Sequence, residues 1–364
     1  MKIAKYLVRE ILLESIFIFR NFLRRFVTNL FFNRTRAKIK TKSISKRILF
    51  IRLDSKYGDS IVFQFALEKI KKELNSQIYV LTKNKESIDF FSRIVDYFII
   101  CKNPRRIIQL YQSYKELSEI HFDYVIHLDK NIKDRELILL RYIKATSVIT
   151  ADTRVKFATQ YLIQKGEVIH ARKRYINLLN AMNIQTSGNE STQLEIPNTY
   201  IKKLEKLTEK TGRIIYFNPY GSGSQRKLSA IKINEIRNHI QEIFPNFSIL
   251  IQSKEHRELS IKGADASVYT FETNSFNDIL ALINISVFVI SVDTATSHAA
   301  TALDKPSIVF YNTNKENYIE WNADSVRSLP IFSKKQKGKV LSDIGNFSND
   351  ELNNSLIKIK AAIN

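Results

Sequence analysis

Short runs of β-forming residues alternate with helical stretches from residue 47 onward, and this alternation constrains the fold more than any other feature. The first block of expected strands covers 47–53, 77–82, 97–100, 122–128 and 146–151, and the second covers 213–219, 247–252, 267–271, 287–293 and 306–311. Strands separated by helices form parallel sheets built from βαβ units. The sequence therefore predicts an α/β protein with two Rossmann-like domains that face a cleft.

A polar stretch at 183–200 separates the two blocks and sets the expected domain boundaries. We expect an N-terminal domain at 47–190, a C-terminal domain at 200–340 and a final helix within 341–364. Ligands bind such sheets beyond the carboxyl ends of the strands. Three unusual loops follow strands at that end, and we expect all three to face the cleft: 54–59, 218–227 and 292–298.

Residues 1–46 form a basic arm. The formal charge of the chain is +21, and residues 1–47 carry 13 Lys and Arg against Glu10 and Glu14, a net of 11. Charges interrupt this segment too often for a membrane-spanning helix. Basic residues mixed with Phe, Leu and Ile are typical of an amphipathic helix on an anionic membrane surface. The alternatives are an arm that packs on its own domain, and nucleic-acid binding, for which no named module is present.

Other composition signals exclude several classes of protein. A single cysteine, Cys101, excludes an internal disulfide framework and a cysteine-based zinc site. The sequence also shows no cluster of His and carboxylate residues at metal-ligand spacing, so we expect no metal site. A hydrophobic content of 44% fits a folded globular chain.

The loop at 292–298 carries the most specific signal for chemistry. Asp293, Thr294, Thr296 and Ser297 crowd the start of an Ala-rich helix, where main-chain N–H groups and the helix dipole favour an anion. His298 lies in the first turn of that helix. The alternative is a capped helix with a buried histidine.

Two further loops are weaker signals by themselves. The loop at 218–227 is a Gly/Ser turn followed by Arg226 and Lys227, which suits phosphate, although a surface turn is equally consistent with it. The Gly58–Asp59 pair precedes an expected helix at 60–74. It either caps that helix or holds a carboxylate over a ligand.

Taken in order, these segments resemble family 9 glycosyltransferases, the bacterial lipopolysaccharide heptosyltransferase group with the two-domain GT-B fold. The resemblance spans about 47–335. Its N-terminal part rests on Arg52 and the Gly58–Asp59 pair, and its linker part on His170, Arg174, Tyr175, Leu178, Leu179 and Ile184. Its C-terminal part rests on Asn218, Pro219, Gly221 and Lys227, and on the D-T-G-x-x-H-x-A-x-A-L-x-K-P signature, matched by Asp293, Thr294, His298, Ala300, Ala302, Leu303, Lys305 and Pro306.

The resemblance implies a metal-independent, inverting transfer of a sugar from a nucleotide donor, typically ADP-heptose, to a lipopolysaccharide core or related envelope glycan. The N-terminal domain takes the acceptor and the C-terminal domain takes the nucleotide sugar. Asp59 is implied as the base that accepts the proton of the acceptor hydroxyl, and Lys227 as the cation that stabilises the leaving diphosphate. The expected donor-binding residues are Ser222, Ser224, Glu255, Asp293, Thr294, Ala295, Thr296, Ser297 and His298.

The same resemblance implies an anionic glycolipid acceptor, no cofactor and no nucleic-acid partner. Lys56, Lys130 and Arg135 are the expected acceptor contacts, and the enzyme is expected to be cytoplasmic and peripheral on the inner membrane of a bacterium through residues 1–46. The chain departs from the pattern at Ala295, which replaces a glycine and loses its freedom at positive φ. Leu228 and Ser229 replace an aromatic-proline pair. The alternatives are a transferase for another nucleotide sugar, a nucleotide-sugar epimerase, or a non-catalytic envelope-glycan partner.

Overall fold

The computed structural model divides into two compact units. Unit 1 comprises Met1–Ser55, Ala66–Glu167 and Lys173–Gly188, and unit 2 comprises Lys56–Phe65, Val168–Arg172 and Asn189–Asn364. Within these bounds the structure describes residues 19, 21–35, 46–53, 56–83, 91–101, 103, 107–188, 190–192, 194–202, 204–221, 223–253, 267–272, 275–336, 338 and 343–363.

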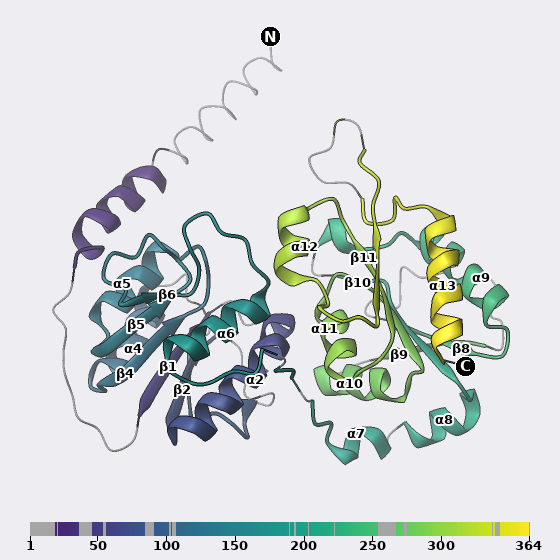
Figure 1. The fold of residues 1–364 in the computed structure, drawn as a ribbon, viewed down its shortest axis with the longest axis horizontal. Coiled ribbons are helices and arrows are strands. Elements are labelled where there is room, and N and C mark those ends of the chain that lie inside the picture. Colours follow the sequence, from purple (N-terminus) through teal and green to yellow (C-terminus); the bar gives the residue numbers. More distant parts are fainter. Residues whose placement is uncertain are drawn as a thin grey trace, which may run out of the picture. The chain divides into compact units, whose positions relative to one another are not determined.

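Unit 1 is built on a six-stranded parallel sheet with the order β3-β2-β1-β4-β5-β6 (Figure 1). Its strands are β1 (Arg47–Arg52), β2 (Gln77–Thr82), β3 (Tyr97–Ile100), β4 (Phe122–His127), β5 (Ala145–Thr150) and β6 (Gln160–Tyr161). The helices that connect or follow them are α2 (Tyr57–Leu74), α4 (Ile107–Ser118), α5 (Asp134–Tyr142) and α6 (Ala171–Ala181).

Unit 2 repeats this plan with the order β12-β11-β10-β7-β8-β9, again parallel throughout. Its strands are β7 (Ile214–Asn218), β8 (Ser248–Ser253), β9 (Val268–Glu272), β10 (Phe288–Val292), β11 (Ser307–Tyr311) and β12 (Ser328–Phe332). Its helices are α7 (Asn198–Lys202), α8 (Glu205–Thr211), the 3₁₀ turn η1 (Ser224–Arg226), α9 (Ala230–Ile243), α10 (Phe276–Ile285), α11 (Ala295–Ala302), α12 (Lys315–Trp321) and α13 (Asn349–Ile363).

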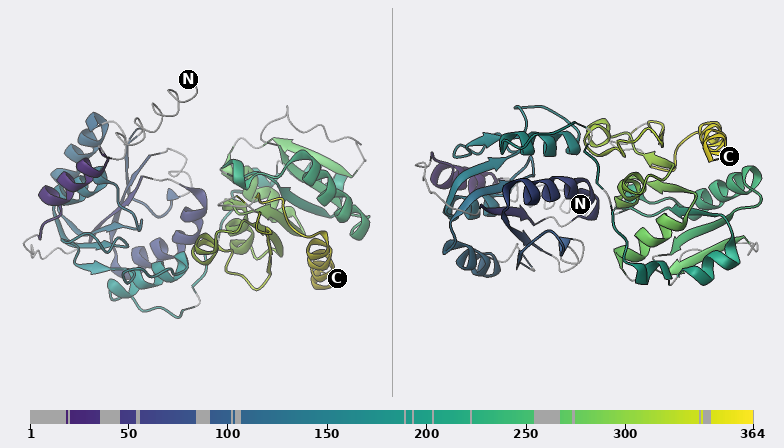
Figure 2. Two further views of the ribbon diagram at one scale, coloured as in Figure 1. Left: turned by 90° about the horizontal axis from the view of Figure 1, so that it is seen from above. Right: turned by 60° about the horizontal axis from the view of Figure 1, so that its bottom comes forward.

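Each sheet is buried on both faces. Helices pack on both sides of each sheet (Figure 2), and all five residues of β7, β10 and β11 are buried. Double burial explains why these strands read as continuous apolar runs instead of alternating with polar residues. The prediction of two parallel α/β blocks is confirmed.

The final helix belongs to the core of unit 2. Leu352, Leu356 and Ile359 of α13 are buried in the same apolar cluster as Ile240 of α9 and Phe310 of β11. A helix that contributes three side chains to one core is fixed in place by apolar burial. α13 is therefore an integral layer of unit 2.

Both sheets have the strand order 3-2-1-4-5-6 when their strands are counted along the chain. In this topology the chain changes direction between the first and fourth strands, and ligands bind beyond the carboxyl ends of those two strands. We therefore expect ligands to bind at the loops after β1 and β4 in unit 1, and at the loops after β7 and β10 in unit 2.

Candidate functional site

The loops after β7 and β10 meet beyond the strand ends of unit 2. The buried side chain of Asn218, the last residue of β7, donates from Nδ2 to Thr296 Oγ1 at 2.7 Å. Its Oδ1 accepts a hydrogen bond from the main-chain N–H of Tyr220 at 3.0 Å. One amide side chain thus ties the strand end to the first turn of α11 and fixes the start of the 218–227 loop.

Thr294 is the N-cap residue of α11. Its Oγ1 accepts from the N–H of Thr296 at 3.2 Å, and Ser297 Oγ donates to its carbonyl oxygen at 2.8 Å. Ala295 is the first helical residue and does not have a positive φ. The lost freedom at positive φ therefore has no consequence here, because helical backbone suits alanine. The N-terminus of α11 carries the partial positive charge of the helix dipole.

Gly221 lets the second loop pass very close to η1. A Cβ at this position would lie 2.5 Å from Arg226 Cβ and 2.6 Å from Arg226 O, and 3.3 Å from Thr294 Cγ2. Tyr220 and Lys227 also form an antiparallel bridge across the base of this loop. The 218–227 loop is therefore a folded turn against the start of α11.

Asp293 anchors Arg226 beside this turn. Its Oδ2 accepts from Asn317 Nδ2 at 2.9 Å and lies 3.5 Å from Arg226 Nη1, while Arg226 Nη2 donates to Asn317 Oδ1 at 3.3 Å. Burial raises the pKa of Asp293, against the opposing effects of Arg226, Asn317 and Lys56. Asp293 is engaged in holding the loop, and it places a guanidinium with a one-third exposed side chain near the N-terminus of α11.

His298 is a neutral side chain in this site. It is buried, and burial lowers its pKa to about 4, with a smaller contribution from His170 that outweighs the opposing Asp324. The edge of its ring approaches Trp321 with centroids 6.3 Å apart. His298 is therefore uncharged at neutral pH and does not supply positive charge to an anion.

The first turn of α2 also belongs to unit 2 and lies against α11. A Cβ at Gly58 would lie 3.0 Å from His298 Cδ2 and 3.5 Å from Ala295 Cα. Asp59, which is partly exposed, is the third residue of α2. The interpretation of Asp59 as the cap of a helix beginning at 60 is wrong, because α2 begins at Tyr57. All three predicted loops thus contribute residues near the N-terminus of α11.

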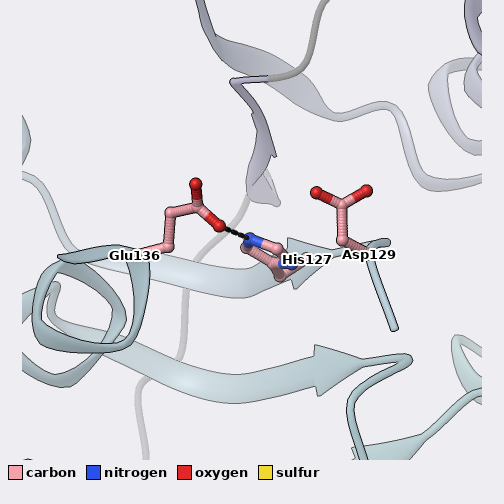
Figure 3. Close-up of side chains that lie close together, drawn as sticks. All are labelled: His127, Asp129 and Glu136. Atoms are coloured by element: carbon pink, nitrogen blue, oxygen red, sulfur yellow. Dashed lines mark ion pairs between the residues drawn. The ribbon is translucent and has the colours of Figure 1, made fainter. Parts of the chain in front are cut away.

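Unit 1 holds a second cluster at its own topological switch point. His127 ends β4, and its Nε2 lies 3.3 Å from Oε2 of Glu136 on α5 (Figure 3). The ligand atoms of His127, Glu136 and Asp129 all lie within 4.8 Å of one another. The sequence shows no cluster at metal-ligand spacing, but the fold brings these three side chains together, and the prediction of no metal site stays a prediction. His127 and Glu136 are nine residues apart and lie on a strand end and a helix, a spacing that matches no familiar metal motif.

The carboxylate of Glu136 in this cluster is already in contact with neighbouring cationic side chains. Glu136 Oε1 lies 3.6 Å from Arg135 Nη2 and 3.7 Å from Lys133 Nζ, and Oε2 accepts from the N–H of Lys133 at 3.2 Å. Burial by itself would raise the pKa of Glu136, but the His127 hydrogen bond and the nearby positive charges hold it below its ordinary value. The cluster therefore works as a buried charge network, and the residues present fit a divalent cation poorly.

The remaining predicted residues have separate placements. Lys227 is exposed immediately after η1, and Ser224 begins η1. Lys56 lies in unit 2, whereas Lys130 and Arg135 lie in unit 1 after β4. Ser222 and Glu255 lie outside the described residues. Asn317 was missed, although the polar TNKEN run after β11 was a usable signal.

Comparisons with known proteins agree with the resemblance to family 9 glycosyltransferases that the sequence motifs indicate. The family model described as "Glycosyltransferase family 9 (heptosyltransferase)" matches residues 111–342. The chain is 26% identical over 319 residues to the Escherichia coli protein named "Putative lipopolysaccharide heptosyltransferase 4", covering 85% of this chain and 87% of that protein.

Solved structures show the same fold. A family 9 glycosyltransferase from Veillonella parvula has a TM-score of 0.72 and 15% identity, with 89% of this chain and all of that chain covered. The E. coli ADP-heptose lipopolysaccharide heptosyltransferase II has a TM-score of 0.67 and 15% identity, with 86% and 98% covered. Together with the family match, these findings show that the chain belongs to glycosyltransferase family 9, whose members transfer a sugar residue from a nucleotide-sugar donor.

Proposed function

We propose that the protein transfers heptose from ADP-heptose to the core of lipopolysaccharide, with inversion and without a metal ion, at the cytoplasmic face of a bacterial inner membrane. The names of the curated relative and of the E. coli heptosyltransferase II support the donor and acceptor classes. The observation that carries the proposal is the convergence of Gly221, Arg226 and the N-terminus of α11 at the switch point of unit 2.

The donor diphosphate binds at this convergence. The Gly221 turn allows close approach of main chain to ligand, and the dipole of α11 favours negative charge at its N-terminus. Arg226, held by Asp293 and Asn317, presents a fork of N–H donors that matches phosphate oxygens. Lys227 provides a second cation beside it. These groups stabilise the charge that develops on the diphosphate as the glycosidic bond breaks.

Asp59 is the proposed base. Inverting transfer requires a carboxylate that accepts the proton of the acceptor hydroxyl on the face opposite the leaving group. Asp59 lies in the first turn of α2, one residue after the Gly58 that packs on α11, and it remains partly exposed. A carboxylate in this position is near the proposed donor site and accessible to a second substrate.

The proposal of a metal-independent reaction is supported by the contacts that buried carboxylates of both units make with cationic side chains. Asp293 is bound to Asn317 and Arg226, and Glu136 is bound to His127 and surrounded by Lys133 and Arg135. Carboxylates that already neutralise cations are poor ligands for Mg²⁺. Arg226 and the helix dipole supply the positive charge that a metal ion supplies in other transferases.

The acceptor contacts are proposed in unit 1. Lys130 and Arg135 flank the His127–Glu136 network beyond the carboxyl end of β4. Glu136 holds the guanidinium of Arg135 at 3.6 Å, so the cation is positioned before a phosphorylated glycan arrives. The cleft that would bring this surface to the donor stays a prediction.

A transfer assay tests the proposal. Purified full-length protein is incubated with ADP-heptose and lipopolysaccharide from a heptose-deficient bacterial strain, with and without EDTA, and the product is analysed by mass spectrometry and NMR. We expect one added heptose of inverted anomeric configuration and equal rates in both samples. A parallel panel of UDP-sugars tests other donors. Transfer from a UDP-sugar alone, donor conversion without acceptor, or loss of activity in EDTA would contradict the corresponding part of the proposal.

A further inference from the structure

Residues 21–32 form a helix (Figure 1). It is docked on unit 1 mainly through polar contacts, together with one ring contact between Phe32 and Tyr142 of α5, whose centroids are 5.9 Å apart. Arg24 Nε lies 2.8 Å from Asp134 Oδ2 at the start of α5. At the end of the helix the buried Asn33 donates from Nδ2 to Arg154 O and accepts at Oδ1 from the N–H of Lys156, both at 2.7 Å. These contacts fix which face of the helix is turned toward the protein.

A small cavity of mixed lining lies under this docked face, and its apolar part consists of Ile132, Leu137 and Val155. It has a volume of about 40 Å³, and its polar lining consists of Arg25, Asn29, Asn33, Asp134, Asp152 and Arg154. The buried residues here are Thr28 on the helix and Asn33 just after it, both polar, and Phe32 is half-buried. An ordinary surface helix of a globular protein buries its apolar stripe and exposes its polar face. Apart from Phe32, this helix has the reverse arrangement.

The opposite face is apolar and exposed. Seven of the 17 exposed large apolar side chains in the described part of the chain lie between residues 19 and 31. Phe22 is 66% exposed and Phe26 is 55% exposed, and their rings stack with centroids 6.5 Å apart. The full set recurs at helical spacing and consists of Phe19, Phe22, Leu23, Phe26, Val27, Leu30 and Phe31. A contiguous patch of this kind marks an interaction surface.

The positive charge around this apolar face indicates which kind of partner it binds. Residues 19–47 contain ten Lys and Arg residues and no Asp or Glu. Pairing two copies through this face would bring two such basic segments together, which like-charge repulsion opposes. Apolar side chains flanked by basic residues instead match the interface of a bilayer that contains anionic lipid. Among the described residues, no helix is both long and apolar enough to cross a membrane.

We propose that the apolar face of residues 19–31 inserts into the interface of an anionic phospholipid bilayer and holds unit 1 at its surface. The contacts with unit 1 agree with the interpretation of the arm as one that packs on its own domain. The interpretation as a membrane-binding arm stays a prediction, which this proposal assigns to the opposite face of the helix. The proposal is independent of the sugar donor, since membrane binding needs no substrate.

Vesicle sedimentation tests the proposal with the full-length chain. The test variant replaces Phe22, Phe26 and Leu30 by Ser. A matched control replaces three exposed isoleucines on other helices by Ser, Ile108, Ile231 and Ile357, which are 72%, 73% and 56% exposed. Vesicles contain phosphatidylcholine alone or equal amounts of phosphatidylcholine and phosphatidylglycerol. Thermal unfolding of both variants is measured in parallel.

We expect the wild type and the isoleucine control to sediment with the anionic vesicles, and the helix variant to lose at least about tenfold in bound-to-free ratio with its unfolding temperature unchanged. Sedimentation that survives in the helix variant, or that is absent in the wild type, would overturn the proposal. So would a wild-type dimer that is abolished by the same three substitutions without any vesicle binding.

Discussion

The Gly221 turn offers the sharpest test of the site geometry, because a methyl group there has no space. In Gly221→Ala the new Cβ would lie 2.5 Å from Arg226 Cβ and 2.6 Å from Arg226 O. Carbon atoms in favourable contact are about 3.5–4.0 Å apart, so the η1 backbone has to move by about 1 Å. Gly223 is two residues away and has no atom within 4 Å of its added Cβ, which makes Gly223→Ala a matched control.

We expect Gly221→Ala to cost about 1–3 kcal/mol of unfolding free energy, in the range of overpacked sites. That cost corresponds to about 2–4 °C in unfolding temperature per kcal/mol for a domain of this size. Because Arg226 moves with the backbone, kcat/KM should also fall by roughly 100-fold. Gly223→Ala should stay within about 0.5 kcal/mol of the wild type. Urea unfolding and steady-state kinetics measure both effects, and equal behaviour of the two variants would refute the close packing of this turn.

Three further substitutions test the charges of the two clusters. Burial holds the pKa of His298 at about 4, below about 6.5 in the unfolded chain, so the unfolded state binds the proton first as pH falls and stability is lost between these values. Urea unfolding should show the wild type losing about 2 kcal/mol more than His298→Gln between pH 7 and pH 5, and parallel losses would contradict this. Arg226→Gln should weaken ADP binding about 10- to 100-fold in calorimetry, whereas Arg327→Gln, which removes an exposed ion pair, should leave it unchanged. Glu136→Gln should lower the unfolding free energy by about 1–3 kcal/mol at pH 7, and the exposed control Glu116→Gln should not; equal values would show that the His127–Glu136 contact adds nothing.

Continuous apolar runs made the parallel sheets predictable, and the strands without such runs were missed. β12 contains Pro330, which argues against a strand, but it lies at the sheet edge, where a missing N–H is tolerated. β6 is only two exposed residues long and carries no burial pattern. The start of α2 was set too late because Gly58 is a poor helix former, while the structure uses its lack of a side chain for packing on α11.

The loops of the site were predictable because each follows a strand, but the bonds within them were not. Asn218 and Thr296 are 78 residues apart, and nothing in the local sequence indicates that the amide of one meets the hydroxyl of the other. The signature also identified Asp293 without its function, which depends on Asn317 and Arg226. The His127–Glu136 pair escaped because it needs a strand end and a helix turn to be adjacent in space.

The proposed base is tested most directly by comparing two carboxylates that both lie in the first turn of a helix. Asp59 lies in the first turn of α2, and the exposed Asp350 lies in the first turn of α13. Calorimetry with ADP and initial rates with ADP-heptose and a heptose-deficient lipopolysaccharide are measured for Asp59→Asn and Asp350→Asn. The proposal predicts that Asp59→Asn keeps ADP affinity within about twofold while kcat falls by roughly 10²- to 10⁴-fold, and that Asp350→Asn changes neither. A kcat for Asp59→Asn equal to that of the wild type would contradict the assignment of Asp59 as the group that accepts the proton.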